Sequence, residues 1–304
     1  MSGMHRDRIK IKQSRGLSFR KKIQLASAVL FNGYVVGFAK GSLFIGKTKA
    51  VCVPILNCYS CPGAFGACPI GSMQTALGGA KHHFPFYVLG SLMLFGILFG
   101  RLICGFLCPF GLVQELIHKL PVKKWKVPKK IDKPLRYLKY FILLVPVVLL
   151  PAFASGSTPP YFCKYICPAG TLGGGIPQLI SNPQLRQLAG ALFDWKVLVL
   201  IIILAASIFI PRPFCRYLCP LGAFYGLFNR FGFYQMRLNQ NLCVGCKKCE
   251  ASCPMAFEVT GQLNYAECIR CGKCREVCST KAISTGFFVK PLTTILEVDS
   301  KKGE

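Results

Sequence analysis

Four apolar segments run through the first 210 residues of the chain. They are residues 23–45, 84–100, 138–153 and 197–210. None carries the polar stripe that marks the exposed side of a surface helix, so each is typical of a membrane span. Fourteen residues make only about 21 Å of helix against a hydrocarbon core of about 30 Å, so we expect flanking residues or other buried structure to complete the shorter spans. The pattern predicts an α-helical integral membrane protein with four transmembrane helices.

Basic residues are distributed unevenly between the segments that join these spans. Residues 1–22 carry eight lysines and arginines and residues 119–139 carry nine, whereas residues 40–83 carry four and residues 154–195 carry two. Positive loops stay in the cytoplasm, so we expect both chain ends there, in a multi-pass protein of the prokaryotic inner membrane. The net charge of +27 goes with only 16% charged and 52% hydrophobic residues, which favours a membrane protein over a nucleic-acid binder.

The chain contains 18 cysteines, several times the usual frequency. Disulfide-rich secreted scaffolds are short and follow a cleavable signal peptide, and the basic segment 1–22 leads into no such signal. The remaining explanation is metal binding, and thiolates at this density indicate iron–sulfur clusters.

One motif, Cys-Pro-x-Gly, occurs once after each apolar segment. GRLICGFLCPFG at 100–111 matches RPFCRYLCPLG at 212–222, a third copy is CKYICPAG at 163–170, and a degenerate copy is CPIG at 68–71. The motifs fall alternately on the outer and the inner side, which predicts two parallel halves related by an axis along the membrane normal. The proline stops the preceding structure, and the glycine permits a close backbone approach.

Each side of the membrane then receives enough thiols for a cubane cluster, which needs four. The inner side has Cys104, Cys108, Cys215 and Cys219. The outer side has Cys163 and Cys167 with two of Cys58, Cys61 and Cys68, and Cys52 stays unassigned. Buried apolar cysteines are a weaker interpretation because core packing does not explain the repeated Pro-x-Gly, and structural zinc usually takes the closer C-x2-C spacing.

The strongest motif is a pair of ferredoxin runs at 243–278, in which the fourth cysteine of each run serves the other cluster. One [4Fe-4S] cluster takes Cys243, Cys246, Cys249 and Cys278. The other takes Cys268, Cys271, Cys274 and Cys253. Basic residues among these ligands could stabilise reduced clusters, dock an acidic partner, or simply be solvated.

These patterns predict four parts. Residues 1–22 form a basic cytoplasmic N-terminus, 23–235 a four-span membrane domain, 236–285 a cytoplasmic two-cluster ferredoxin-type α+β domain, and 286–304 a C-terminal tail.

The motifs at 100–111 and 212–222, together with the tandem ferredoxin runs, resemble the membrane-bound polyferredoxins of the NapH and NosR type over roughly residues 84–280. Phe106 stands where the family often has tryptophan, and the chain carries no flavin domain. The resemblance implies a quinol-dehydrogenase membrane component that feeds a respiratory reductase. The outer motifs are not part of the family pattern, so an outer cluster is an addition of this chain.

The cluster pattern itself predicts transmembrane electron transfer that links a cytoplasmic low-potential partner such as ferredoxin with an extracytoplasmic flavin, haem or iron–sulfur protein. Two alternatives stay open: quinol oxidation, with His82, His83 and His118 as candidates for a quinone site, and an iron–sulfur sensor or assembly factor. No C-x-x-C-H, dinucleotide fingerprint or P-loop occurs, and Glu115, Asp132 and Asp194 form no recognisable catalytic constellation. Direction of flow and oligomeric state are not determined by these patterns.

Overall fold

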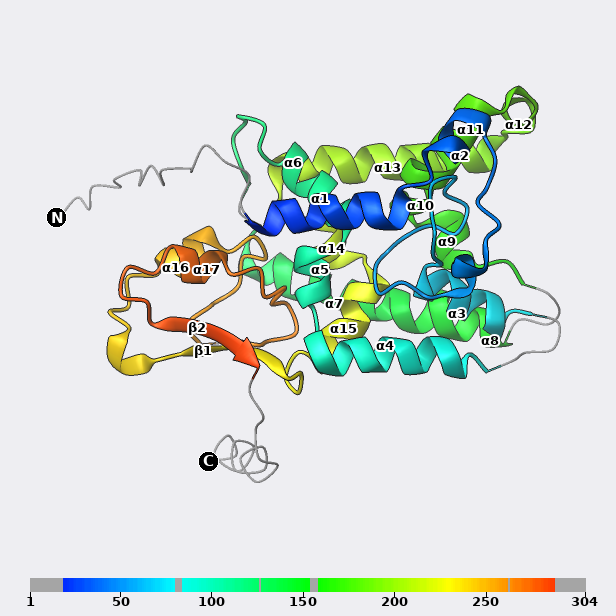
Figure 1. The fold of residues 1–304 in the computed structure, drawn as a ribbon. Helices are drawn as coiled ribbons and strands as arrows, with labels where there is room; N and C mark the ends of the chain where they lie inside the picture. The colour runs from blue at the N-terminus through cyan, green and yellow to red at the C-terminus, as the bar shows by residue number, and fades with distance from the viewer. Residues whose placement is uncertain (1–18, 80–83, 126, 154–157, 262, 288–304) are drawn as a thin grey trace.

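The computed structural model describes residues 19–79, 84–125, 127–153, 158–261 and 263–287. Long helices lie side by side in one lobe, and a small lobe with a two-stranded sheet closes one end of it (Figure 1). The described residues are therefore mainly helical, with a small C-terminal lobe that contains the one two-stranded sheet described.

The helices before the sheet have the following bounds. They are α1 Phe19–Asn32, α2 Val35–Lys40, η1 Lys47–Ala50, α3 Pro69–Leu77, α4 Phe86–Phe99, α5 Leu102–Phe106, α6 Pro109–Ile117, α7 Lys129–Ile142, η2 Leu143–Leu149, α8 Leu150–Phe153, α9 Tyr161–Tyr165, α10 Pro168–Gly170, η3 Thr171–Gly175, α11 Ile176–Ser181, α12 Pro183–Gln187, α13 Ala191–Phe209, α14 Pro213–Tyr217 and α15 Pro220–Phe228. The small lobe consists of β1 Tyr234–Leu238, η4 Gln240–Leu242, α16 Lys248–Ser252, α17 Lys273–Glu276 and β2 Ile283–Phe287.

Two helices are long and apolar enough to cross a membrane: Lys129–Phe153, which joins α7, η2 and α8, and α13. At about 1.5 Å per residue, their 25 and 19 residues reach roughly 38 and 28 Å. Both begin N-terminal to the expected apolar segments, so flanking residues do extend them. The apolar helix α4 is shorter, and the segment 23–45 is divided between α1 and α2 rather than forming one continuous helix.

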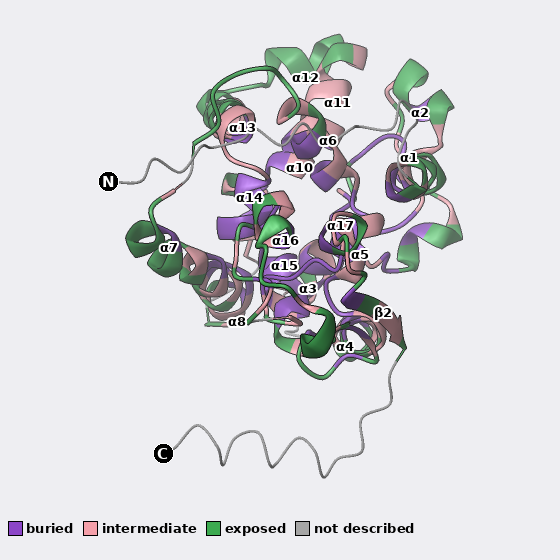
Figure 2. Ribbon diagram, turned by 90° about the vertical axis from the view of Figure 1, so that its left-hand side faces the viewer, coloured by how far each residue is buried: buried purple, intermediate pink, exposed green. Residues whose placement is uncertain are grey.

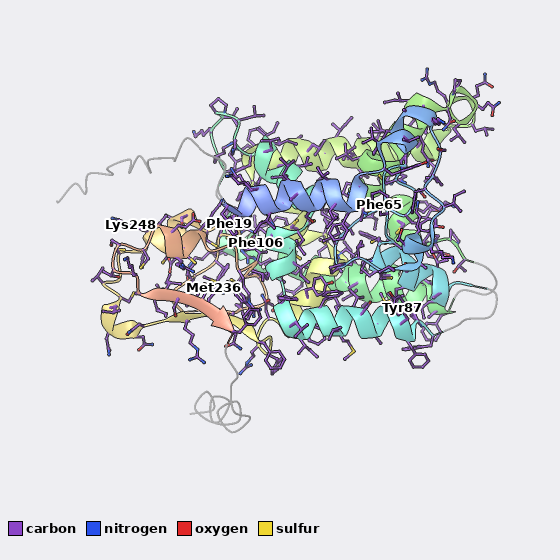
Figure 3. All side chains as sticks on the ribbon, in the orientation of Figure 1. Phe19, Phe65, Tyr87, Phe106, Met236 and Lys248 are labelled. Atoms are coloured by element: carbon purple, nitrogen blue, oxygen red, sulfur yellow. The ribbon has the colours of Figure 1, made fainter. Side chains whose placement is uncertain are left out.

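The long helices stand at the periphery and surround the short cysteine-bearing helices, which are buried (Figure 2). Apolar side chains project outward from the peripheral helices, as Tyr87 does from α4 in Figure 3. Leu94, Phe141 and Ile202 are likewise more than half exposed. Polar side chains such as Gln24 and Ser207 instead point inward and are buried. Exposed apolar side chains together with polar side chains that are turned inward are what a lipid environment favours.

The small lobe is held by an antiparallel pair in which Tyr234 of β1 lies opposite Phe287 of β2, and Leu238 lies opposite Ile283. Its own small core gathers apolar side chains and cluster cysteines. They are Met236, Cys249, Val259, Cys268, Cys274 and Ile283. Few other apolar groups are buried in this lobe, so its cysteines occupy the centre of its fold.

Candidate iron–sulfur centres

The four Cys-Pro pairs have one local geometry. Cys68, Cys108, Cys167 and Cys219 are the N-cap residues of α3, α6, α10 and α15, and the following proline is the first residue of each helix. Proline suits this position because the missing N–H has no partner in the first turn anyway. The repeated motif therefore starts a new helix and leaves each cysteine at the turn before it.

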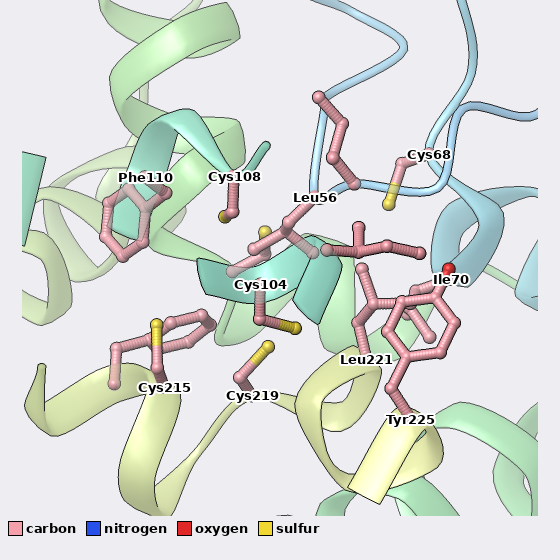
Figure 4. Packing of buried hydrophobic residues seen from close by; sticks show 14 of the residues in the cluster. Leu56, Cys68, Ile70, Cys104, Cys108, Phe110, Cys215, Cys219, Leu221 and Tyr225 are labelled. Atoms are coloured by element: carbon pink, nitrogen blue, oxygen red, sulfur yellow. The ribbon is translucent and has the colours of Figure 1, made fainter. Parts of the chain in front are cut away.

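The inner cysteine set comprises Cys104 on α5, Cys215 on α14, and the N-cap residues Cys108 and Cys219. All four side chains are buried. The Cys219 thiol interacts electrostatically with those of Cys215, Cys104 and Cys108. In Figure 4 the sulfur atoms of Cys104 and Cys219 point toward each other, with Cys215 and Cys108 beside them. The structure thus brings together the four thiols that the sequence assigned to the inner side.

Two fully buried arginines clamp this set reciprocally. Arg101 donates from Nη2 to the carbonyl oxygen of Cys215 at 3.1 Å, and Arg212 donates from Nη1 to the carbonyl oxygen of Cys104 at 2.8 Å. A Cβ added at Gly222 would lie 3.1 Å from Arg101 Nη2, and one added at Gly111 would lie 3.2 Å from Arg212. The motif glycines therefore make room for the opposing arginine, which places positive charge beside the thiols.

The buried carboxylate of Glu115 balances the charge of Arg212. Glu115 pairs with Arg212 at 2.9 Å and with Arg20. Burial raises the pKa of Glu115, but the charges of Arg212 and Arg20 outweigh burial and lower the pKa to about 2. The carboxylate is therefore ionised at neutral pH.

Asp132 is a second buried carboxylate, and it lies toward the small lobe. Asp132 pairs with Arg136 and Arg216 and accepts a hydrogen bond from the Tyr217 hydroxyl at 2.7 Å. These contacts join α7 to α14 through buried ion pairs.

Four of the outer cysteines also face one another. The Cys163 thiol interacts electrostatically with those of Cys167, Cys68 and Cys58. A Cβ added at Gly170 would lie 3.5 Å from the Cys58 sulfur, so the motif glycine here makes room for a thiol rather than an arginine. We call Cys58, Cys68, Cys163 and Cys167 the outer cysteine set.

Cys61 and Cys52 lie beside this set. The Cys61 thiol donates to Asn32 Oδ1 at 3.6 Å, and a Cβ added at Gly173 would lie 3.8 Å from its sulfur. Cys52 forms an isolated parallel bridge with Ala67. Of the three candidates that the sequence left open, Cys58 and Cys68 are therefore the two that we propose as ligands with Cys163 and Cys167.

In the small lobe, the eight ferredoxin cysteines line two separate cavities. The first includes Cys253, Cys268, Cys271 and Cys274 in its lining. The second includes Cys243, Cys246, Cys249 and Cys278. These groups coincide with the two ligand sets expected from the motif, in which the runs exchange their fourth cysteines.

The first of these cavities abuts the inner cysteine set. A Cβ added at Gly105, beside Cys104, would lie 2.4 Å from the carbonyl oxygen of Ile269 and 3.8 Å from the Cα of Cys271. Arg101 also reaches across this junction and donates to the Ala266 carbonyl oxygen at 2.7 Å and to Glu267 at 3.1 Å. Burial raises the pKa of Glu267, but the charges of Arg101 and Lys139 outweigh it, and the pKa lies below its ordinary value. An ionised carboxylate thus joins the two lobes.

Hydrogen-bond donors surround the cysteine sulfurs, as expected for cysteines that bind iron–sulfur clusters. The Gly170 and Gly222 N–H groups donate to the sulfurs of Cys167 and Cys219 at 3.4 and 3.3 Å. Buried amides of Gln74 and Gln114 donate to Cys163 and Cys215. A thiolate is a far better acceptor than a neutral thiol, and a buried cluster needs such donors and nearby cations. Within the described residues no three histidine, cysteine or carboxylate side chains are placed to hold a single metal ion, whereas cubane ligands each bind a different iron.

Several functional contacts were missed from the sequence. An arginine stands three residues before both Cys104 and Cys215, and this match could have indicated the arginine contacts with the inner set. No sequence signal indicated the contacts of Gln74, Gln114 and Glu267. Of the quinone-site candidates, His82 and His83 lie outside the described residues, and His118 Nδ1 lies 3.1 Å from the Ser207 carbonyl oxygen on α13. That contact gives His118 a role in helix packing.

Comparison with known proteins agrees with these sites. The chain matches the 4Fe-4S binding domain family over residues 81–128, 140–182 and 194–238, and the 4Fe-4S dicluster domain family over residues 235–279. Residues 140–182 contain the second outer motif, so a family pattern also covers that copy. No solved structure matches the chain significantly.

Three relatives illustrate the similarity. The uncharacterized protein MJ0750 of Methanocaldococcus jannaschii is 36% identical over 208 residues, which is 66% of this chain and 77% of that protein. The methylamine utilization ferredoxin-type protein MauN of Paracoccus denitrificans is 28% identical over 60% of this chain and 59% of its own length. The regulatory protein NosR of Stutzerimonas stutzeri is 30% identical over 56% of this chain, which corresponds to only 22% of NosR. With these relatives and its 4Fe-4S domains, the chain belongs to the membrane-bound polyferredoxin family of the NapH and NosR type.

Proposed function

We propose that this protein carries electrons across the membrane between a cytoplasmic low-potential donor and an extracytoplasmic redox partner. Four cysteine groups would hold [4Fe-4S] clusters: two in the small lobe, the inner cysteine set, and the outer cysteine set. A bound cluster supplies one-electron oxidation and reduction, and its potential depends on the surrounding hydrogen bonds and charges.

The observation that carries the proposal is that the small lobe, the inner cysteine set and the outer cysteine set lie in contact one after the other. We call these the three levels. Gly105 brings the inner set against Ile269 of the small lobe. The fully buried side chain of Tyr225 belongs to the same core cluster as Cys104 of the inner set and Cys68 of the outer set, and its hydroxyl donates to the Pro54 carbonyl oxygen at 3.2 Å. One buried core therefore joins the two cysteine sets, and in the view of Figure 4 Leu221 lies between Cys104 and the ring of Tyr225.

Topology and partners are part of the same proposal. The charge distribution supports cytoplasmic termini and a small lobe on the cytoplasmic side. Lys21, Lys119 and Lys273 interact electrostatically at this end, and such a positive cluster suits an acidic ferredoxin as donor. A flavin, haem or iron–sulfur protein would meet the outer set on the other side. The family resemblance implies quinol oxidation. Among the described residues, His118 is the one quinone-site candidate, and it contacts the Ser207 carbonyl oxygen instead.

The first experiment measures iron and acid-labile sulfide on anaerobically purified protein. Four cubanes predict about 16 irons per chain and two predict about 8. Cys108→Ser and Cys167→Ser should each lower the iron content by about four, one at each level. Cys52→Ser, the control, should leave the iron content unchanged.

The second experiment uses proteoliposomes that contain ferricyanide inside and receive reduced ferredoxin outside. Wild-type protein should reduce the trapped ferricyanide, and both ligand variants should lose this activity. A wild-type iron content near 8 would overturn the proposal, because the membrane lobe would then hold no cluster.

A further inference from the structure

Two buried glutamines occupy matching places at the inner and the outer level. Gln74 and Gln114 each lie six residues after the cysteine of a Cys-Pro pair, in the sequence Cys-Pro-x-Gly-x2-Gln. Both side chains are completely buried. The other two motifs have Gly173 and Tyr225 at this position, so each level contains one such glutamine.

Each glutamine reaches across to the partner motif of its own level. Gln74 Nε2 lies 3.4 Å from the sulfur of Cys163, and Gln114 Nε2 lies 3.2 Å from the sulfur of Cys215. The contacts join residues 89 and 101 positions apart in the chain. The same atom arrangement thus recurs at two levels.

The orientation of each amide is fixed by its other contacts. Gln74 Oε1 accepts the N–H of Phe162 at 2.9 Å, and Gln114 Oε1 accepts the N–H of Phe214 at 3.1 Å. Since a backbone N–H requires an acceptor, the oxygen must face the backbone and the NH₂ group must face the sulfur. The second proton of each Nε2 is directed to the carbonyl oxygen four residues earlier in the helix, at 3.2 and 3.4 Å.

We propose that Gln74 and Gln114 are positioning residues that set the reduction potentials of the outer and the inner cluster. The inference rests on the proposed function, because it requires Cys163 and Cys215 to be cluster ligands. An N–H group directed at a thiolate sulfur stabilises the more negative, reduced form of the cluster and therefore raises its potential. The donor comes from a side chain that the surrounding backbone holds in place, so it is present in both oxidation states.

The magnitude follows from the strength of one hydrogen bond. Removal of a single donor should shift the equilibrium constant for reduction by about tenfold, which is about 59 mV for one electron. The shift should be toward lower potential. It should affect one cluster only, because each glutamine contacts one level.

The test is a redox titration of the full-length protein in detergent, followed by electron paramagnetic resonance. Gln114→Glu keeps an oxygen for the Phe214 N–H but removes the amide donor, and Gln74→Glu does the same at the outer level. Because an ionised glutamate also adds a negative charge, Gln114→Leu and Gln74→Leu, which remove the donor without a charge, should lower the potential of the same components. We expect each variant to keep the wild-type iron content and to lower the potential of one component, a different one at each level. Gln24→Leu is the control, because the buried Gln24 amide has no hydrogen-bond partner in the structure.

Three results would overturn the inference. The first is unchanged potentials in both glutamate variants at full iron content. The second is a shift of the same component in both variants. The third is a shift in Gln24→Leu as large as theirs. If a glutamate variant loses its cluster, the potentials are measured in Gln114→Leu and Gln74→Leu instead. Loss of the cluster from all four glutamine variants would show a role in cluster assembly and would overturn the inference. A wild-type iron content near 8 refutes the proposed function separately, before any variant is made.

Discussion

Replacement of Glu267 by glutamine should loosen the junction between the small lobe and the membrane lobe. The carboxylate accepts from Arg101 at 3.1 Å and from Lys139, and both cations are fully buried. Glutamine has nearly the same shape but no charge, so the variant leaves two positive groups buried without a counter-ion. Removal of one partner from a buried pair typically costs about 3–5 kcal/mol.

The cost can be measured at a backbone hydrogen bond that joins the two lobes. The N–H of Phe233, at the start of the small lobe, donates to the Ile97 carbonyl oxygen of α4 at 3.0 Å. If separation of the lobes exposes this N–H, a loss of about 3 kcal/mol should speed its hydrogen exchange roughly a hundredfold. The iron content should not change, because no cysteine is altered.

Glu258→Gln provides the matched control. Glu258 also pairs across the junction, with Lys129, but the two side chains are 57% and 79% exposed. Exposed pairs contribute little to stability because water screens them. If Glu267→Gln exchanged no faster at Phe233 than Glu258→Gln, the carboxylate would not hold the lobes together and the reasoning would be wrong.

Further outcomes follow from the packing. Cys58→Ser should lower the iron content by about four, whereas Cys61→Ser should leave it unchanged, and equal losses in both would contradict the geometric choice between them. Gly105→Ala should lower the melting temperature in detergent, because its Cβ would lie 2.4 Å from the Ile269 carbonyl oxygen. Gly90→Ala, where a Cβ meets nothing within 4 Å, should raise it slightly, since alanine favours helix by about 0.5–1 kcal/mol.

Local patterns in the sequence determined much of this protein. The spacing of the ferredoxin runs separated eight cysteines into two groups of four, and the same groups line the two cavities. The proline of each Cys-Pro pair marked a break in the preceding structure, and in the folded protein a new helix begins at each of the four prolines, a position that proline favours. Both signals depend on residues a few positions apart, so they can be identified without a fold.

The tertiary structure decided the contacts that join distant residues. The choice of Cys58 over Cys61 depends on how the loop before α3 packs against Cys163. The pairing of Glu267 with Arg101 joins residues 166 positions apart, and the glutamine–sulfur contacts span about 90 to 100 positions. Such contacts depend on helix packing, which brings residues together irrespective of their separation in the chain. The environment that would set the cluster potentials therefore becomes visible only in the folded protein.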